Sequence, residues 1–294
     1  MESRPCQSHN DEDMKMSKQF GNRAVRLALA LILAGMMAGG IASANERIFA
    51  YTYEPETLPK GAWEFEQWVT WRAGRNEAVG QNHYSRFEVR EELEYGVTDN
   101  YTASLYYNGS YTSFREPDTG NDKSRFLWDG VSIENRYMLL NPATNPVGLT
   151  LYVEPRFSDR EVEFEQKIIL GQRCGDWKWA LNLIHATEWS LLKDGGTEGE
   201  VELVFGLARQ LGHHWSIGFE LRDHNELPEY ERWENSAVYL GPAISYRAEH
   251  WWFALTVLPQ IYGTNFQQNP DREVDMELEG HEKINVRLIV GFSF

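Results

Sequence analysis

The sequence predicts a single antiparallel transmembrane β-barrel of about twelve strands, and three observations lead to this fold class. A basic stretch followed by a short apolar run near the N-terminus has the form of an export signal. The rest of the chain contains long segments in which apolar and polar side chains alternate. The connections between these segments alternate between short turns and longer polar loops, as in bacterial outer-membrane barrels.

The export signal is expected to occupy residues 1–44. Basic residues between positions 18 and 26 precede an apolar run over 27–41, which ends in small residues that predict cleavage after Ala44. The run is too short, and too rich in Gly and Ala, to make an N-terminal membrane anchor the better interpretation. Because acidic residues precede Met14, the true start is expected at Met14 or Met16.

Composition excludes some function classes. The chain has 294 residues, with 28 Lys and Arg against 44 Asp and Glu. Five of the basic and four of the acidic residues lie in 1–44, which leaves a net charge of −17 after cleavage. Such a charge argues against nucleic acid as a partner, because phosphates require a positive surface. Only Cys174 would remain after cleavage, so an internal disulfide is not expected.

The last segment separates a membrane barrel from a soluble β-sandwich. Every even position from Ile284 to Phe294 is apolar, whereas the odd positions carry Lys, Asn, Arg, Ile, Gly and Ser. Side chains two residues apart share one face of a strand, so one face suits lipid and the other water. Sandwich strands usually have only about 5–6 residues. The length of the alternating segment therefore favours the membrane barrel.

The same pattern predicts twelve strands, and their even number puts both termini on the periplasmic side. Tryptophans cluster near both ends of these segments, as expected of aromatic girdles at the two membrane surfaces. The predicted strands are 62–72, 84–95, 101–114, 126–140, 148–157, 162–173, 177–191, 200–211, 215–225, 235–247, 251–262 and 282–294.

Two stretches resemble known sequences. Phe294, preceded by Val290 and Phe292, resembles the terminal signal that the barrel-assembly machinery reads. Residues 46–66, with Leu-Pro-Lys-Gly followed by Glu-x-Glu, resemble the opening of an uncharacterised family of proteobacterial outer-membrane barrels that are porin-like or transporter-like. The resemblance implies an outer-membrane location and contact with outer-membrane lipid, and it implies no catalytic residues.

The positions that alternate with the apolar register are expected to line the lumen. They could form a polar pore that attracts and orients a small solute, or a salt-bridge network that fills a narrow barrel. Strand number does not decide between these, because twelve lies between filled and open barrels. The predicted lumen residues are Glu64, Glu66, Thr70, Arg72, Arg86, Glu88, Arg90, Glu92, Glu94, Glu134, Arg136, Glu154, Arg156, Glu163, Glu165, Lys167, Glu200, Glu202, Glu220, Arg222, Arg247, Lys283 and Arg287.

The organisation expected after the signal is a periplasmic N-terminal segment, 45–60, followed by the barrel, 61–294. The tyrosines and prolines of the segment leave two placements open. It could fold into the lumen as a partial plug, or it could extend into the periplasm.

Enzyme chemistry is not expected, although twelve-strand outer-membrane barrels include phospholipases. Such a site needs a serine and a histidine in hydrogen-bond reach. His185 is the only histidine clearly within a predicted strand; its neighbour on the same face is Thr187, and Ser190 lies on the other face. An enzyme of this class nevertheless stays an alternative function.

No metal and no cofactor are expected. His213 and His214 are adjacent in a turn and so point in different directions. An acidic loop is interpreted as a solvated external loop facing lipopolysaccharide, because it lacks the spacing of a calcium site. Its acidic residues are Asp271, Glu273, Asp275, Glu277 and Glu279.

Taken together, these patterns predict a passive channel or transport-related protein for small polar or amphipathic solutes. The alternatives are the phospholipase-like enzyme and a structural or surface-binding barrel with a closed lumen. The sequence leaves the oligomeric state open.

Overall fold

The computed structural model describes residues 47–75, 82–116, 118–193, 195–266 and 276–294. Residues Ala42–Ser293 belong to one compact unit. The predicted signal peptide, Asp271, Glu273 and Asp275 lie outside the described residues. In the part of the chain that is described, no helix is long and apolar enough to cross a membrane.

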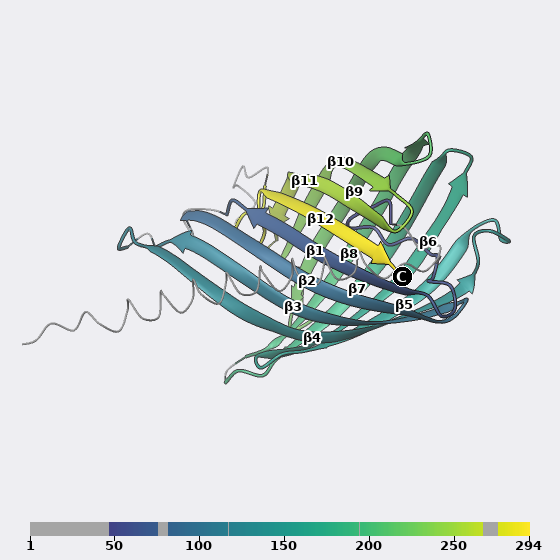
Figure 1. Cartoon of the computed structure of the whole chain (residues 1–294). Helices are drawn as coiled ribbons and strands as arrows, with labels where there is room; N and C mark the ends of the chain where they lie inside the picture. Colours follow the sequence, from purple (N-terminus) through teal and green to yellow (C-terminus); the bar gives the residue numbers. More distant parts are fainter. Residues whose placement is uncertain (1–46, 76–81, 117, 194, 267–275) are drawn as a thin grey trace, which may run out of the picture. The chain divides into compact units, whose positions relative to one another are not determined.

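Twelve antiparallel strands close into a barrel, as predicted, with each strand beside its sequence neighbours and β1 beside β12 (Figure 1). Closure leaves no free sheet edge. The strands are β1 Trp63–Ala73, β2 Asn82–Thr98, β3 Tyr101–Arg115, β4 Asp122–Leu140, β5 Gly148–Phe157, β6 Glu161–Cys174, β7 Trp177–Ser190, β8 Thr197–Leu211, β9 Trp215–Pro228, β10 Asn235–Arg247, β11 Trp251–Asn265 and β12 Ile284–Ser293.

The two ends of the barrel differ in their connections. One end, called the turn end below, has most of the short connections, such as the one between β2 and β3. The other, called the loop end, has most of the longer ones, such as the one between β11 and β12. Several strands continue further toward the loop end than the apolar pattern predicts; β9, for example, ends at Pro228 rather than at residue 225. Backbone pairing continues there because it does not require apolar side chains.

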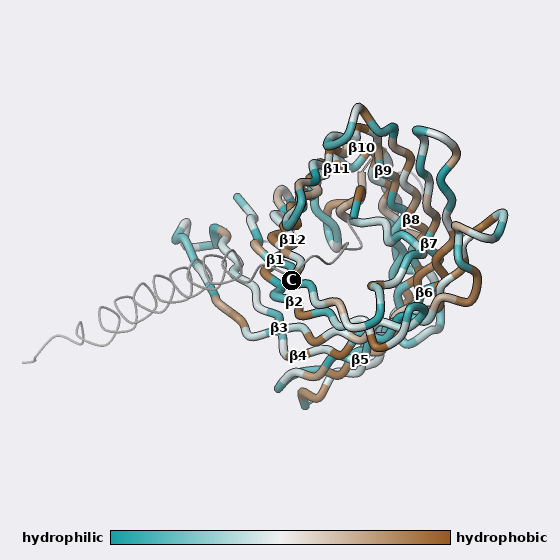
Figure 2. The backbone as a smooth tube through the Cα atoms, turned by 45° about the vertical axis from the view of Figure 1, so that its right-hand side comes forward, coloured by the Kyte–Doolittle hydropathy of each residue, from teal (hydrophilic) through white to brown (hydrophobic). Residues whose placement is uncertain are grey.

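Exposure alternates along the strands as a barrel with an apolar outer surface requires. In β3, Leu105 and Tyr107 are 55% and 49% exposed, whereas Tyr106 between them is fully buried. Hydrophilic and hydrophobic positions alternate along the barrel wall in Figure 2. The expected aromatic girdle is incomplete, because Trp252 is only 1% exposed and its ring packs against Gly291.

Candidate functional site

The N-terminal segment, residues 47–59, runs through the interior of the barrel. Phe49, Ala50, Thr52 and Leu58 have no exposed surface. Backbone groups of the segment bond to side chains of β9, β7 and β3, which belong to different parts of the wall. Of the two placements that the sequence left open, the described part of the segment adopts the one inside the barrel and does not extend away from it.

Glu220 of β9 holds the first part of this segment. Its carboxylate accepts hydrogen bonds from the backbone N–H groups of Ala50 at 3.0 Å, Tyr51 at 2.9 Å and Thr52 at 2.5 Å. The hydroxyls of Thr52 and Thr256 donate to it at 2.7 Å and 2.5 Å. Hydrogen bonds to an ionised group are stronger than those between neutral groups. These five bonds satisfy a carboxylate that is fully buried.

Polar side chains of three further strands hold the second part. Asn182 of β7 accepts from the Tyr53 N–H at 2.6 Å and donates to the Tyr53 carbonyl at 2.9 Å, as a neighbouring strand would. Thr102 of β3 accepts from the Leu58 N–H at 2.9 Å. Thr150 of β5 donates to the Pro55 carbonyl at 2.5 Å. Each buried backbone group named here therefore has a partner on the wall.

Small residues on the wall make room for the segment. Phe49 packs in an apolar cluster with Ala180, Ala208 and Ala243. A Cβ atom at Gly206 would lie 2.8 Å from the Phe49 ring, closer than side chains approach one another. The wall is thus shaped to accept this phenylalanine.

Cations and aromatic rings pack together beside the segment. The Arg47 guanidinium lies 4.1 Å from the ring centre of Tyr53 and 4.5 Å from that of Trp68. The Lys167 ammonium lies 4.2 Å from the Tyr53 ring and 4.1 Å from the Tyr152 ring. Contacts of this kind stabilise a cation that is removed from water.

Next to these rings is a buried belt of charged groups. Arg136 forms ion pairs with Glu94 and, at 2.6 Å, with Glu134. Glu66 and Glu92 are each 1% exposed and lie close to Glu94. The N-terminal segment, the rings and this belt fill the barrel interior here.

Toward the loop end the interior is open, with a cavity of about 660 Å³. Its wall contains several ion pairs, among them Arg72 with Glu88 at 3.0 Å and Arg90 with Glu154 at 2.5 Å. The charged residues that line it are Arg72, Arg86, Glu88, Arg90, Arg125, Asp129, Glu154, Arg156, Arg160, Glu161, Glu163, Glu165, Glu188, Glu200 and Arg287. We call this cavity the vestibule.

Arg287 differs from the vestibule arginines that form ion pairs, such as Arg72 and Arg90. Its Nε donates to the Thr70 hydroxyl at 2.9 Å, and its guanidinium lies 4.0 Å from the ring centre of Tyr51 in the N-terminal segment. It makes no ion pair with a carboxylate of any described residue. Arg287 therefore offers a positive charge to the vestibule, directly above the segment that fills the barrel.

The predicted lumen residues thus lie in four regions, with Lys283 outside all of them. One group, which includes Arg72 and Arg287, lines the vestibule, and a second group, including Glu64 and Arg136, lies in the filled part. Glu202 and Arg222 form an ion pair toward the loop end. Arg247 is at the turn end, where its Nε donates to the His213 carbonyl. Lys283 is exposed and precedes β12, so it does not join the others. Its neighbour Glu282 is fully buried instead and pairs with Arg72 at 2.9 Å.

Residues 276–283, the described end of the connection between β11 and β12, fold into the mouth of the loop end. The Glu277 side chain accepts hydrogen bonds from the backbone N–H groups of Glu279, Gly280 and His281. Burial raises the pKa of Glu277 and lowers the pKa of His281 to about 2. Glu277 is only 3% exposed, so the prediction that it lies in a solvated loop is wrong. It is buried because its carboxylate organises the turn that carries His281 inward.

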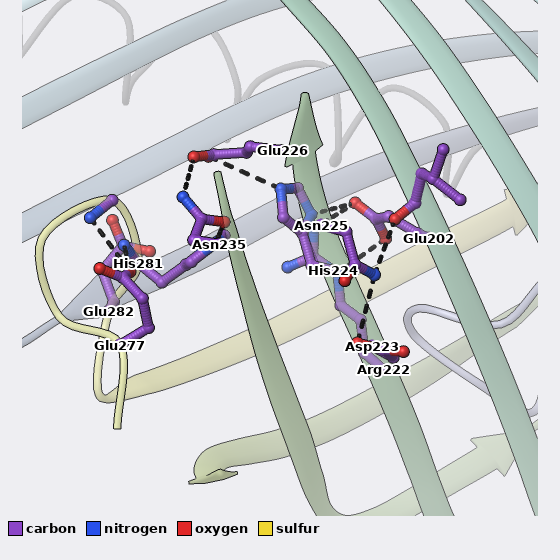
Figure 3. Close-up of polar contacts among 12 residues, drawn as sticks. Glu202, Arg222, Asp223, His224, Asn225, Glu226, Asn235, Glu277, His281 and Glu282 are labelled. Atoms are coloured by element: carbon purple, nitrogen blue, oxygen red, sulfur yellow. Dashed lines mark hydrogen bonds and ion pairs between the residues drawn. The ribbon is translucent and has the colours of Figure 1, made fainter. Parts of the chain in front are cut away.

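At this mouth, His281 meets His224 and Glu226 of β9 (Figure 3). The two imidazole rings have their centres 4.8 Å apart and are nearly perpendicular. His224 also contacts Glu202, its Nδ1 lying 2.5 Å from a carboxylate oxygen, and that carboxylate is held by Arg222. These side chains form the mouth cluster: His224, Glu226, His281, Glu202, Arg222 and Asn235.

Family membership follows from the sequence itself. Residues 41–168 and 178–294 match the model of a family of unknown function, DUF6662. The chain belongs to this family. No curated protein matches the DUF6662 chain in sequence.

Solved structures resemble the DUF6662 chain in fold. An outer-membrane channel from Pseudomonas putida F1 is 11% identical over 81% of this chain and 97% of that one, with a TM-score of 0.54. The NanC porin is 10% identical over 78% of this chain and 100% of that one, with a TM-score of 0.50. At this level of identity the likeness shows a common barrel fold.

His185 of the DUF6662 chain has other partners than the serine that a phospholipase-like site requires. Its Nε2 lies 3.1 Å from the Tyr230 hydroxyl, and its Nδ1 lies 3.4 Å from the Gln166 amide. Thr187 bonds to the same tyrosine hydroxyl. Among the described residues, no serine hydroxyl bonds to His185.

Sequence reasoning missed the mouth cluster of this DUF6662 member although a signal was present. His224 and Glu226 continue the even register of Glu220 and Arg222 along β9. The expectation that only His185 lies clearly within a strand is wrong, because His224 lies in β9 and His83 in β2. Nothing in the sequence places His281 beside them.

Proposed function

We propose that this chain is an outer-membrane channel for small polar solutes that its own N-terminal segment closes at the turn end. The observation that carries the proposal is the vestibule, a charged cavity of about 660 Å³ inside a closed barrel with an apolar outer surface. Charged side chains that faced lipid would cost about 2–4 kcal/mol each at mid-membrane. Their position inside, with apolar residues outside, supports a wall between lipid and water.

The proposed orientation puts the loop end outside the cell and the turn end in the periplasm. Outer-membrane barrels have short periplasmic turns and longer external loops. The vestibule then opens toward the exterior, and residues 47–59 lie on its periplasmic side. A solute would enter the vestibule first and pass only when the segment moves.

The vestibule favours solutes that carry a negative group. Most of its arginines are neutralised by neighbouring carboxylates, such as Arg160 by Asp129 at 3.1 Å. Arg287 makes no such pair with a described residue and lies at the floor of the vestibule. A planar anionic group such as a carboxylate matches a guanidinium geometrically. The remaining polar wall suits hydroxyl or amide groups.

A structural barrel with a closed lumen is the second candidate function. The observation that favours it is the N-terminal segment, whose bonds to Glu220, Asn182 and Thr102 hold it firmly in the interior. If these bonds never break in the membrane, solutes cannot cross. The two functions therefore differ in whether residues 47–59 leave the barrel.

Conductance in planar bilayers tests the proposal. The chain without its predicted signal peptide is compared with a variant that also lacks residues 47–58. We expect brief openings in the first protein and a stable conductance in the second. A folded deletion variant without conductance and without flux of small solutes into vesicles would exclude a channel. Conductance only in the deletion variant would support the closed structural barrel.

A further inference from the structure

We propose that His224, Glu226 and His281 bind a divalent transition-metal ion such as Zn²⁺ at the loop-end mouth of the barrel. One possible ligand atom from each of the three side chains lies within 4.8 Å of the others. His224 and His281 are 5% and 1% exposed. The site joins residues from two segments that are more than fifty positions apart in the sequence (Figure 3).

His224 is oriented as a metal ligand. Its Nδ1 lies 2.5 Å from a Glu202 oxygen, which only accepts hydrogen bonds, and 2.7 Å from an Arg222 nitrogen, which only donates them. The contact with the carboxylate is the shorter one, so we assign the proton of the neutral ring to Nδ1. Arg222 donates to both oxygens of the same carboxylate. The opposite nitrogen, Nε2, faces Glu226 at 3.8 Å. Metal-binding histidines usually have such a carboxylate on the nitrogen that does not bind the metal.

His281 offers a free nitrogen, and Asn235 shows which one. The amide nitrogen of Asn235 must face Glu226, because the Glu226 carboxylate, 2.6 Å away, only accepts hydrogen bonds. The amide oxygen of Asn235 therefore faces His281, at 2.8 Å from Nε2. Nε2 is thus the donor, and the lone pair of a neutral ring is on Nδ1. This nitrogen makes no hydrogen bond to any residue that the structure describes.

Two imidazoles and one carboxylate select the class of ion. Imidazole nitrogen suits Zn²⁺, Cu²⁺ and Ni²⁺, whereas Ca²⁺ and Mg²⁺ prefer oxygen ligands. Bonds of about 2.0–2.1 Å in a tetrahedral zinc site put neighbouring ligand atoms roughly 3.4 Å apart. The ligand atoms here, which lie within 4.8 Å of one another, would approach by up to about 1.4 Å. Three protein ligands leave the fourth position for water or a solute.

The ion would link the connection between β11 and β12 to the wall of the barrel. His281 comes from that connection, whereas His224 and Glu226 come from β9. Glu282 already anchors the connection through Arg72 and Arg75. His281 is also bonded to Asn235 of β10. Metal binding would add a direct attachment to β9, so the mouth would be held in one conformation.

Calorimetric titration of the folded protein in detergent with Zn²⁺ tests the site. We expect one ion per chain, and at least tenfold weaker binding in His281→Ala and His224→Ala. The variant Glu202→Gln, which removes the charge behind His224, should bind about 10–100-fold more weakly. His213→Ala is the matched control, because His213 is an exposed histidine at the turn end, and its affinity should be unchanged.

Unchanged affinity in a folded His281→Ala variant would overturn the proposal, and so would the absence of a bound ion in the unaltered chain. If the variants fail to fold, the visible spectrum of the unaltered chain with Co²⁺ decides. An intense four-coordinate spectrum supports the site, and a weak six-coordinate one overturns it. None of these measurements depends on solute flux, so the result stands apart from the channel proposal.

Discussion

The Glu220 carboxylate lies 2.5 Å from the backbone nitrogen of Thr52, although 168 positions separate the two residues. The same carboxylate also bonds to the N–H groups of Ala50 and Tyr51. A cluster of backbone N–H groups around one anion is a stable arrangement because each bond to the charge reinforces the others. This contact is the main polar attachment of the N-terminal segment to β9.

Glu220→Gln should loosen the segment. The amide keeps the shape of the carboxylate but lacks its charge, so the docked state should lose about 2 kcal/mol, a roughly thirtyfold change in the ratio of docked to released segment. Single-channel recording should then show more frequent openings. Glu200→Gln is the control, because Glu200 lines the vestibule and should leave the opening frequency unchanged. Equal opening frequencies in the two variants would contradict this role of Glu220.

Gly206→Ala should also open the channel, by a steric route. The added Cβ would lie 2.8 Å from the Phe49 ring, so the segment must shift. In a Phe49→Ala background the same substitution should have little further effect, because the ring is gone. A double-mutant cycle of open probability measures this coupling. Additive effects would show that Gly206 does not act through Phe49.

Docking of the segment should weaken as the pH rises. Burial raises the pKa of Glu54 above 4.5, against the opposing effects of Lys178 and Arg47. A carboxyl whose pKa is raised in the docked state stabilises that state below pH 4.5 and loses this contribution as the pH rises through the raised pKa. Hydrogen exchange of residues 47–58, compared with a free peptide at each pH, should show less protection at pH 8 than at pH 5. Glu54→Gln should remove this difference.

Arg287→Gln should reduce selectivity for anions. One charge about 4 Å from a permeating ion is worth about 1 kcal/mol in a water-filled path, which is roughly fivefold in the permeability ratio. Reversal potentials under a salt gradient, measured in the variant without residues 47–58, give this ratio. Arg160→Gln is the comparison, since Asp129 already neutralises Arg160. A larger effect at Arg160 than at Arg287 would speak against the proposed anion site.

Charge on the outer face should be costly at the middle of a strand. Leu183 is 44% exposed near the centre of β7, so Leu183→Arg should destabilise the folded barrel in lipid by about 2–4 kcal/mol. Leu211 is 47% exposed at the turn end of β8, and Leu211→Arg should cost about 1 kcal/mol or less. Urea titration in lipid vesicles measures both. Similar costs at the two positions would contradict a membrane-spanning barrel.

The candidate site could be predicted only in part. The register of Glu220 and Arg222 assigns their side chains to the inner face of β9, and extending it by four residues would have included His224 and Glu226. The register does not predict that Glu220 binds the backbone of the N-terminal segment, or that His224 contacts His281. The position of Trp252 could not be predicted either, because tryptophan is common both at membrane surfaces and in buried positions such as the one it occupies.

The sequence by itself determined the number of strands, their faces and the barrel class. It could do so because the side-chain period of a strand is local, so a few consecutive residues reveal which face is apolar. Only the tertiary structure decided that residues 47–59 fill the barrel and that Glu277 and His281 are buried at its mouth. Those positions depend on partners that become neighbours only when β1 pairs with β12 and the barrel closes. A buried polar group can be satisfied by any strand of the wall, and the alternation pattern does not specify which one.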